Sequence, residues 1–190
     1  DRLFDINFAG HAGDKILAPY AYLRESLQER GIEIHTADYL PAEPDGCLNL
    51  YVASGRLSQY RQVARRKDTV LSAFFAMECP TVEPGMYREL QQAQHFFNRV
   101  FSWSDSASLE PFVGSPLRCL GMCWPQSFDS VHEEVWHRSE RQFLVMVNGN
   151  KMPRFHSPCQ ELYSERIRAI DYFGRTGEID LYGSGWDGPT

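Results

Sequence analysis

Short apolar runs alternate with segments of helical periodicity along the first two thirds of the chain. The apolar runs predict β-strands at residues 3–8, 32–36, 48–53, 69–77, 100–103 and 117–124. The helical periodicity predicts helices at residues 20–30, 57–66 and 85–95. Strands that alternate with helices are typical of a parallel sheet joined by crossover helices. We therefore predict an α/β fold.

The run at residues 69–77, TVLSAFFAM, is almost wholly apolar and ends at Glu78, Cys79 and Pro80. Such a strand is expected at the centre of a parallel sheet, covered on both faces. Ligands of open α/β sheets bind beyond the carboxyl ends of the strands, so Glu78 lies where chemistry is usual. The proline favours an extended residue before it and a sharp exit from the strand. Glu78 is then either a general base for a hydroxyl, or an ordinary glutamate that caps a helix or meets an arginine.

A polar segment at residues 127–141 separates this region from a second patterned one. Beyond it we predict a strand at 142–147, a helix at 157–173 and a strand at 179–182, which form one β-α-β unit. The domain boundaries are then 1–130, a linker at 131–141, and 142–190. A single unit of about 50 residues cannot bury both faces of its sheet. We expect it to lean on the first domain or to belong to a longer protein.

The helix predicted at residues 157–173 carries an arginine on its apolar side. The segment Ser157, Pro158, Cys159 and Gln160 has a capping-box arrangement, with the proline at the first helical position. Arg166 falls within the arc of Tyr163, Ile167, Ile170 and Phe173, whereas Arg168 points the opposite way. The partner of Arg166 is either a phosphate, gripped in bidentate fashion, or a carboxylate of the neighbouring domain. In a helix that starts at Ser157, Arg166 lies too far along to act together with the helix N-terminus, so it would reach a phosphate from the side of the helix.

Two loops directly after predicted strands are further candidates. The loop Asn148, Gly149, Asn150 and Lys151 offers backbone N–H groups and a lysine to an anion, or it is a plain turn. It has neither the dinucleotide glycine fingerprint nor the P-loop pattern. The turn at residues 10–13, GHAG, either borders an acceptor pocket or simply joins a strand to a helix.

Composition narrows the class of protein. A hydrophobic fraction of 43% with 13% aromatics is that of a folded chain, and no run approaches the roughly 20 apolar residues of a membrane span. We expect a cytoplasmic protein. The five cysteines are irregularly spaced, without a second Cys/His pair at zinc-ligand spacing, so neither a disulfide framework nor a metal site is predicted. The formal net charge of −6 argues against nucleic-acid partners.

Several passages resemble the alpha-1,3/1,4-fucosyltransferases, glycosyltransferase family 10. FFAMECP at residues 74–80 and FNRVFSWSDS at 97–106 look like that family's "E-S-P, then a helix, then F-N-x-x-x-x-Y-x-x-D-S" passage, with E-C-P in place of E-S-P. Residues 145–151, 161–170 and 180–186 are similar to the opening of the family's donor domain, particularly in bacterial members. The resemblance covers about residues 69–186, and the first 68 residues fit only by pattern.

The resemblance implies two Rossmann-like domains in the GT-B arrangement, the second of them incomplete here. The first domain engages an acceptor oligosaccharide or glycolipid, and the second holds GDP-fucose. Transfer to a hydroxyl of a galactose- or N-acetylglucosamine-containing glycan inverts the anomeric centre and needs no cofactor and no required metal. The catalytic base falls on Glu78 and the donor-phosphate arginine on Arg166, with Asn148 and Lys151 as further donor-binding candidates.

The family's "F-E-N" strand and "Y-x-T-E-K" helix start do not occur in this sequence. We therefore expect a fragment, with little or no transferase activity by itself, whose full-length parent is compatible with peripheral association at an inner membrane. Two alternatives stay open. One is a non-catalytic glycan-binding module of the same descent, and the other is a GT-B transferase that uses another nucleotide sugar.

Overall fold

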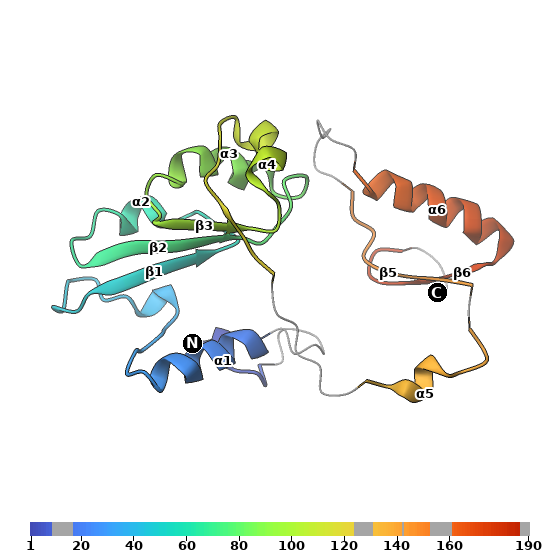
Figure 1. Ribbon diagram of the computed structural model, residues 1–190, viewed down its shortest axis with the longest axis horizontal. Coiled ribbons are helices and arrows are strands. Elements are labelled where there is room, and N and C mark those ends of the chain that lie inside the picture. The colour runs from blue at the N-terminus through green and yellow to red at the C-terminus, as the bar shows by residue number, and fades with distance from the viewer. Residues whose placement is uncertain (9–16, 124–130, 142, 153–160, 187–190) are drawn as a thin grey trace.

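The computed structural model describes residues 1–8, 17–123, 131–141, 143–152 and 161–186, which form two parallel sheets (Figure 1). The first sheet has the order β1-β2-β3-β4. Its strands are β1 (Asn49–Ser54), β2 (Thr69–Ala76), β3 (Arg99–Ser102) and β4 (Leu120–Gly121). The second sheet pairs β5 (Leu144–Val147) with β6 (Ile179–Tyr182). The predicted α/β class, with a parallel sheet flanked by helices, is confirmed and is compatible with a Rossmann-like fold.

The helices of the first sheet lie on one of its faces. They are α2 (Tyr60–Val63), α3 (Pro84–Ala93) and α4 (Ser106–Val113), and each follows one strand and precedes the next. Parallel crossovers are right-handed, so a strand order without a reversal puts its crossover helices on one side. Figure 1 shows these three helices together on that side. The helix predicted at residues 57–66 is shorter in the structure, where it is α2. The sequence had not predicted α4.

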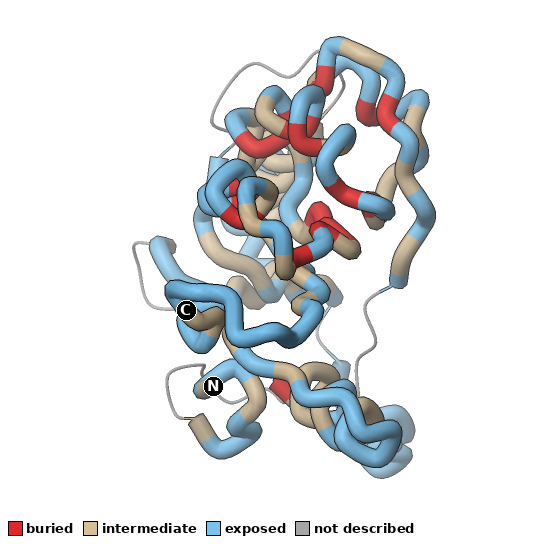
Figure 2. Tube along the Cα trace, turned by 90° about the vertical axis from the view of Figure 1, so that its left-hand side faces the viewer, coloured by how far each residue is buried: buried red, intermediate tan, exposed pale blue. Residues whose placement is uncertain are grey.

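The hydrophobic core lies between this helical layer and the sheet. Figure 2 shows the buried positions gathered almost entirely in one part of the molecule. Phe74 of β2 and Leu90 of α3 are fully buried, and the Phe74 ring meets the Phe97 ring at a centroid distance of 5.8 Å. The apolar β2 is central in this sense, since it pairs with β1 on one side and β3 on the other.

The opposite face of the first sheet is exposed over β1. Leu50 and Val52 are 65% and 52% exposed, although both belong to a parallel strand. Parallel sheets are usually covered on both faces. Two further strands were predicted ahead of β1, at residues 3–8 and 32–36.

Both of those strand predictions are wrong. Residues 2–4 form a 3-10 helix, η1 (Arg2–Phe4). Residues 32–36 form no strand, and a second 3-10 helix, η2 (Ala37–Tyr39), follows them. The segment at residues 32–36 is held by a side chain, and it is not paired with any of the described strands. The Asp1 carboxylate accepts hydrogen bonds from the Thr36 N–H at 3.0 Å and from Arg24 at 3.3 Å. Arg24 belongs to α1 (Ala18–Gln28), close to the helix predicted at 20–30.

The second sheet carries one helix, α6 (Tyr163–Thr176), between its two strands. Leu144 and Met146 of β5 are half-buried, whereas Val145 and Val147 between and after them are exposed. No described residue from 143 onward is buried. This agrees with the small area that a single β-α-β unit can bury. Before it, residues 131–141 hold a short helix, α5 (Glu133–Trp136), and every described side chain there is exposed.

Candidate functional site

Glu78 lies just beyond the carboxyl end of β2, where the sequence places it. We call the bend formed by Met77 and Glu78 the Glu78 corner. Side chains from two neighbouring elements donate hydrogen bonds to its backbone carbonyl groups. The Tyr87 hydroxyl of α3 donates to the Glu78 carbonyl oxygen at 2.6 Å, and the Trp103 indole N–H after β3 donates to the Met77 carbonyl oxygen at 3.1 Å. The Glu78 side chain itself is exposed. The backbone at Glu78 is therefore held by two hydrogen bonds, while its carboxylate is accessible to solvent.

Tyr87 is suited to hold this corner over a wide pH range. Its side chain is almost completely buried, and burial raises the pKa of Tyr87 to about 12. A phenol with such a pKa keeps its proton, so it remains a hydrogen-bond donor to the Glu78 carbonyl. The sequence had not singled out Tyr87 or Trp103 as supports of Glu78.

Cys79 joins the first sheet to the second unit. Its Sγ lies 3.0 Å from Thr81 Oγ1 and 3.8 Å from the hydroxyl oxygen of Tyr163, the first residue of α6. Burial, followed by the contact with Cys79, raises the pKa of the half-buried Tyr163. The carboxyl end of β2 is thus next to the first turn of α6, although nearly half of the sequence separates them.

The start of α6 differs from the prediction. Residues 157–160 lie outside the described part, but Glu161 and Leu162 are described and are not helical. The Glu161 carboxylate accepts the N–H groups of Tyr163 at 2.5 Å and Ser164 at 3.2 Å, and also the Ser164 hydroxyl. These bonds cap orphan donors of a helix that begins here. The capping box predicted at Ser157 therefore does not begin the described helix.

The later start brings Arg166 into the first turn of α6. Its N–H donates to the Leu162 carbonyl oxygen at 3.0 Å. A helix N-terminus favours negative charge, because its N–H groups are free and the helix dipole is positive there. The sideways reach that a start at Ser157 would have demanded is not needed. The Glu161 carboxylate already accepts the N–H groups of Tyr163 and Ser164, so Arg166 lies beside a helix N-terminus that holds one negative charge.

The Arg166 guanidinium stacks on a neighbouring ring. Its central carbon lies 5.3 Å from the centroid of Tyr163, and both side chains are half-buried, as the helical wheel predicted. Arg168 is exposed and pairs with Glu165 at 2.6 Å. Within the described residues Arg166 forms no ion pair with a carboxylate. Its charge contributes only the last of the effects that lower the pKa of Glu161, after the bonds from Ser164 and Tyr163.

The loop after β5 interlocks with the loop after β6. The Trp186 indole N–H donates to the Asn148 carbonyl oxygen at 2.8 Å, and the Asn150 N–H donates to the Ser184 carbonyl oxygen at 2.8 Å. Gly183, with φ of 137°, approaches so closely that a Cβ there would lie 2.0 Å from that Asn148 oxygen. Only glycine permits this approach.

Asn148 and Lys151 thus lie at the carboxyl edge of the second sheet, the edge at which α6 also begins. Asn148 Oδ1 is buried, and no described group donates a hydrogen bond to it. The Lys151 side chain is exposed. No contact between described residues joins either side chain to Arg166. The turn predicted at residues 10–13 lies outside the described part.

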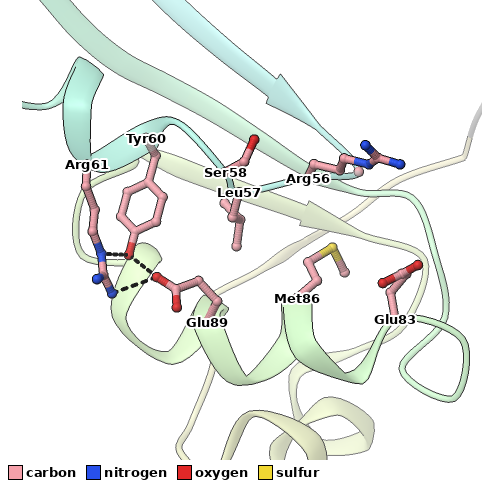
Figure 3. Close-up of a pocket in the computed structure, with 9 residues that line it drawn as sticks. Arg56, Leu57, Ser58, Tyr60, Arg61, Glu83, Met86 and Glu89 are labelled. Carbon is pink, nitrogen blue, oxygen red and sulfur yellow. Dashed lines mark hydrogen bonds and ion pairs between the residues drawn. The ribbon is translucent and has the colours of Figure 1, made fainter. Parts of the chain in front are cut away.

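A pocket that sequence reasoning missed opens at the carboxyl end of β1 (Figure 3). It has a volume of about 530 Å3 and lies between the β1–α2 loop and α3. At one end the Arg61 guanidinium and the Tyr60 hydroxyl both bind the Glu89 carboxylate, at 2.7 Å and 2.6 Å. The sequence signal was Gly55 and Arg56 directly after an apolar run, the position that a ligand site favours in this fold class.

The described residues hold no cluster of histidine, cysteine, aspartate and glutamate that could bind a metal ion. No helix within them has the length and apolar character needed to cross a membrane. Comparison of the chain with protein-family models, curated proteins and solved structures finds no match.

Proposed function

We propose that this chain is part of an inverting glycosyltransferase of the alpha-1,3/1,4-fucosyltransferase type, with the acceptor domain first and the start of the donor domain after it. The observation that carries the proposal is the contact between Cys79 and Tyr163 at 3.8 Å. It brings the corner that holds Glu78 next to the helix turn that holds Arg166. A base on one domain and a phosphate contact on the other are what transfer between two bound substrates requires.

In the proposed reaction Glu78 accepts the proton of an acceptor hydroxyl on galactose or N-acetylglucosamine. The hydroxyl oxygen attacks the anomeric carbon of GDP-fucose from the face opposite the leaving group. The bond from that carbon to the β-phosphate oxygen breaks, and GDP leaves with the electron pair. Attack from the opposite face inverts the anomeric centre.

Negative charge grows on the departing diphosphate, and the donor side offers groups that would stabilise it. Arg166 lies in the first turn of α6, where its half-buried guanidinium stacks on the Tyr163 ring. Asn148 and Lys151 lie at the same edge of their sheet and complete the proposed donor site. The exposed Lys151 supplies a second positive charge.

The test is transfer of radiolabelled fucose from GDP-fucose to a panel of β-galactosyl and N-acetylglucosaminyl acceptors. It uses the longest natural polypeptide that includes these residues, with Glu78→Gln beside the wild type. Glu110→Gln is the matched control, because Glu110 is an exposed glutamate of α4 away from this corner. We expect loss of transfer in Glu78→Gln alone, with folding and GDP binding retained. Undiminished transfer would place the base elsewhere.

A non-catalytic glycan-binding module is the second candidate, and the pocket within the first unit favours it. It predicts saccharide binding without transfer by the wild type. Use of another nucleotide sugar is distinguished in the same assay by replacing GDP-fucose with other labelled donors. Transfer from one of these, and none from GDP-fucose, would change the donor while keeping the roles of Glu78 and Arg166.

A further inference from the structure

The pocket at the carboxyl end of β1 has charged groups at both ends and two apolar side chains and a serine in its middle. Figure 3 shows Tyr60, Arg61 and Glu89 linked at one end, Arg56 and Glu83 at the other, and Leu57, Ser58 and Met86 between them. Its volume of about 530 Å3 is within the range of small-molecule sites. The pocket was not part of the site inferred from the sequence.

The charges that line the pocket balance one another. Among the described lining residues, Arg56 and Arg61 are matched by Glu83 and Glu89, so these residues together carry no formal net charge. Arg61 is also committed to Glu89 and to Gln92, through hydrogen bonds of 2.7 Å and 2.8 Å. A lining of this kind favours neither an anion nor a cation. It favours a neutral ligand rich in hydroxyl groups, each of which can donate to a carboxylate and accept from a guanidinium.

Two lining groups have unused hydrogen-bonding capacity. In the part of the chain that the structure describes, neither Arg56 nor Ser58 forms a hydrogen bond or an ion pair, and both side chains are exposed. Leu57 and Met86, which are 9% and 8% exposed, give the pocket an apolar floor. A sugar ring has a matching surface, since its C–H face packs on apolar side chains while its hydroxyl groups reach polar ones.

The pocket is tied to the Glu78 corner through α3. Met86 lines the pocket, and the next residue, Tyr87, donates to the Glu78 carbonyl oxygen at 2.6 Å. Both sites lie at the carboxyl edge of the same sheet, beyond β1 and β2. The pocket and Glu78 therefore lie on the same side of the first sheet, as two parts of one acceptor site would.

We propose that this pocket binds a neutral sugar residue of the acceptor glycan, held by Arg56 and Ser58 over the Leu57 and Met86 floor. The identification of the ligand as an acceptor rests on the proposed function. The prediction of a hydroxyl-rich neutral ligand rests on the pocket itself. Arg56 is then a residue that determines acceptor specificity, because it selects the sugar next to the one that reacts.

The experiment titrates the 190-residue chain with N-acetyllactosamine, its sialylated form and inorganic phosphate, and follows amide chemical shifts by NMR. The variants are Arg56→Ala and Ser58→Ala, with Arg65→Ala as the control, since Arg65 is exposed and does not line the pocket. We expect N-acetyllactosamine to shift residues of the β1–α2 loop and the start of α3. Arg56→Ala should weaken its binding about tenfold, because a hydrogen bond to a charged group is lost, and Arg65→Ala should not weaken it.

Other outcomes overturn the proposal. These are no binding of N-acetyllactosamine by the wild type, equal binding by wild type and Arg56→Ala, or preferential binding of phosphate or of the sialylated glycan. A transfer assay separates this proposal from the proposed function. Transfer with an acceptor KM that Arg56→Ala leaves unchanged removes the pocket proposal alone. Saccharide binding that depends on Arg56, without transfer by the longest natural polypeptide, removes the transferase proposal alone.

Discussion

The hydroxyl oxygen of Tyr163 lies 3.8 Å from the Sγ of Cys79; Cys79 follows β2 of the first sheet, and Tyr163 begins the helix that joins the two strands of the second sheet. The face of the same tyrosine ring carries the Arg166 guanidinium. One side chain therefore meets the residue after the proposed base and also supports the proposed phosphate contact. Changes at Tyr163 should affect the donor side through the ring and the junction of the two units through the hydroxyl.

Replacing Tyr163 separates these two contributions. Tyr163→Phe keeps the ring under Arg166, so we expect GDP affinity within about twofold of the wild type. Tyr163→Ala removes the ring, and a lost cation–π contact should weaken GDP binding roughly two- to fivefold. Isothermal titration with GDP measures both. Equal weakening in the two variants would show that the hydroxyl, and not the ring, positions Arg166.

Arg166 and Arg168 form a matched pair on α6. Arg166→Ala removes the half-buried guanidinium in the first turn, and we expect GDP binding to weaken roughly ten- to a hundredfold, the range for a hydrogen-bonded charge. Arg168→Ala removes an exposed side chain that pairs with Glu165 at the surface, and its effect should stay within about twofold. Similar losses in both variants would argue for a diffuse electrostatic effect instead of a specific phosphate contact.

The N-terminus of α6 should weaken in acid. The Ser164 hydroxyl, then the N–H groups of Ser164 and Tyr163, lower the pKa of Glu161 below its ordinary value. A lowered pKa in the folded state means that the carboxylate stabilises the fold above the ordinary glutamate pKa, and that this contribution is lost as the pH falls through the lowered value.

The measurement follows the Tyr163 and Ser164 amide resonances from about pH 7 to about pH 3. We expect both to shift together as Glu161 is protonated, with a midpoint below about pH 4.3. Glu161→Gln serves as the control, since its amide does not titrate in this range. A midpoint above the ordinary glutamate value in the wild type would contradict the cap that the structure shows.

Two neighbouring phenylalanines on β2 test the one-sided core. Phe74 points into the helical layer and is fully buried, so Phe74→Ala should lower the free energy of unfolding by about 3–5 kcal/mol. Phe75 lies on the other face, partly buried, and stacks on Phe101 at a centroid distance of 4.7 Å. Phe75→Ala should cost clearly less. Denaturant unfolding measures both, and equal losses would show that the second face is as well covered as the first.

Sequence reasoning worked where a segment's own pattern decides its structure. The run at residues 69–77 forms β2 because continuous apolar residues suit a strand with a neighbour on each side. The same run fixes the position of Glu78, because the strand ends just before it at the carboxyl edge of the sheet. The arc of α6 was also correct, because the side-chain period of a helix does not depend on where the helix begins.

It failed where a structure depends on partners far along the chain. Residues 32–36 alternate like a strand, yet Thr36 binds the Asp1 carboxylate and no neighbouring strand pairs with this segment. The start of α6 was misplaced because Ser157 and Pro158 form a stronger local signal than Glu161, whose cap depends on a particular side-chain geometry.

The sequence by itself therefore determined the α/β class, the strands from residue 49 onward and the position of Glu78, since these follow from local pattern and chain direction. Tertiary structure decided the rest. It placed Arg166 at a helix N-terminus, Tyr163 beside Cys79, and a charge-balanced pocket between Arg56 and Glu89. Each of these depends on side chains from separate elements meeting in space, and no local period or propensity records such a meeting.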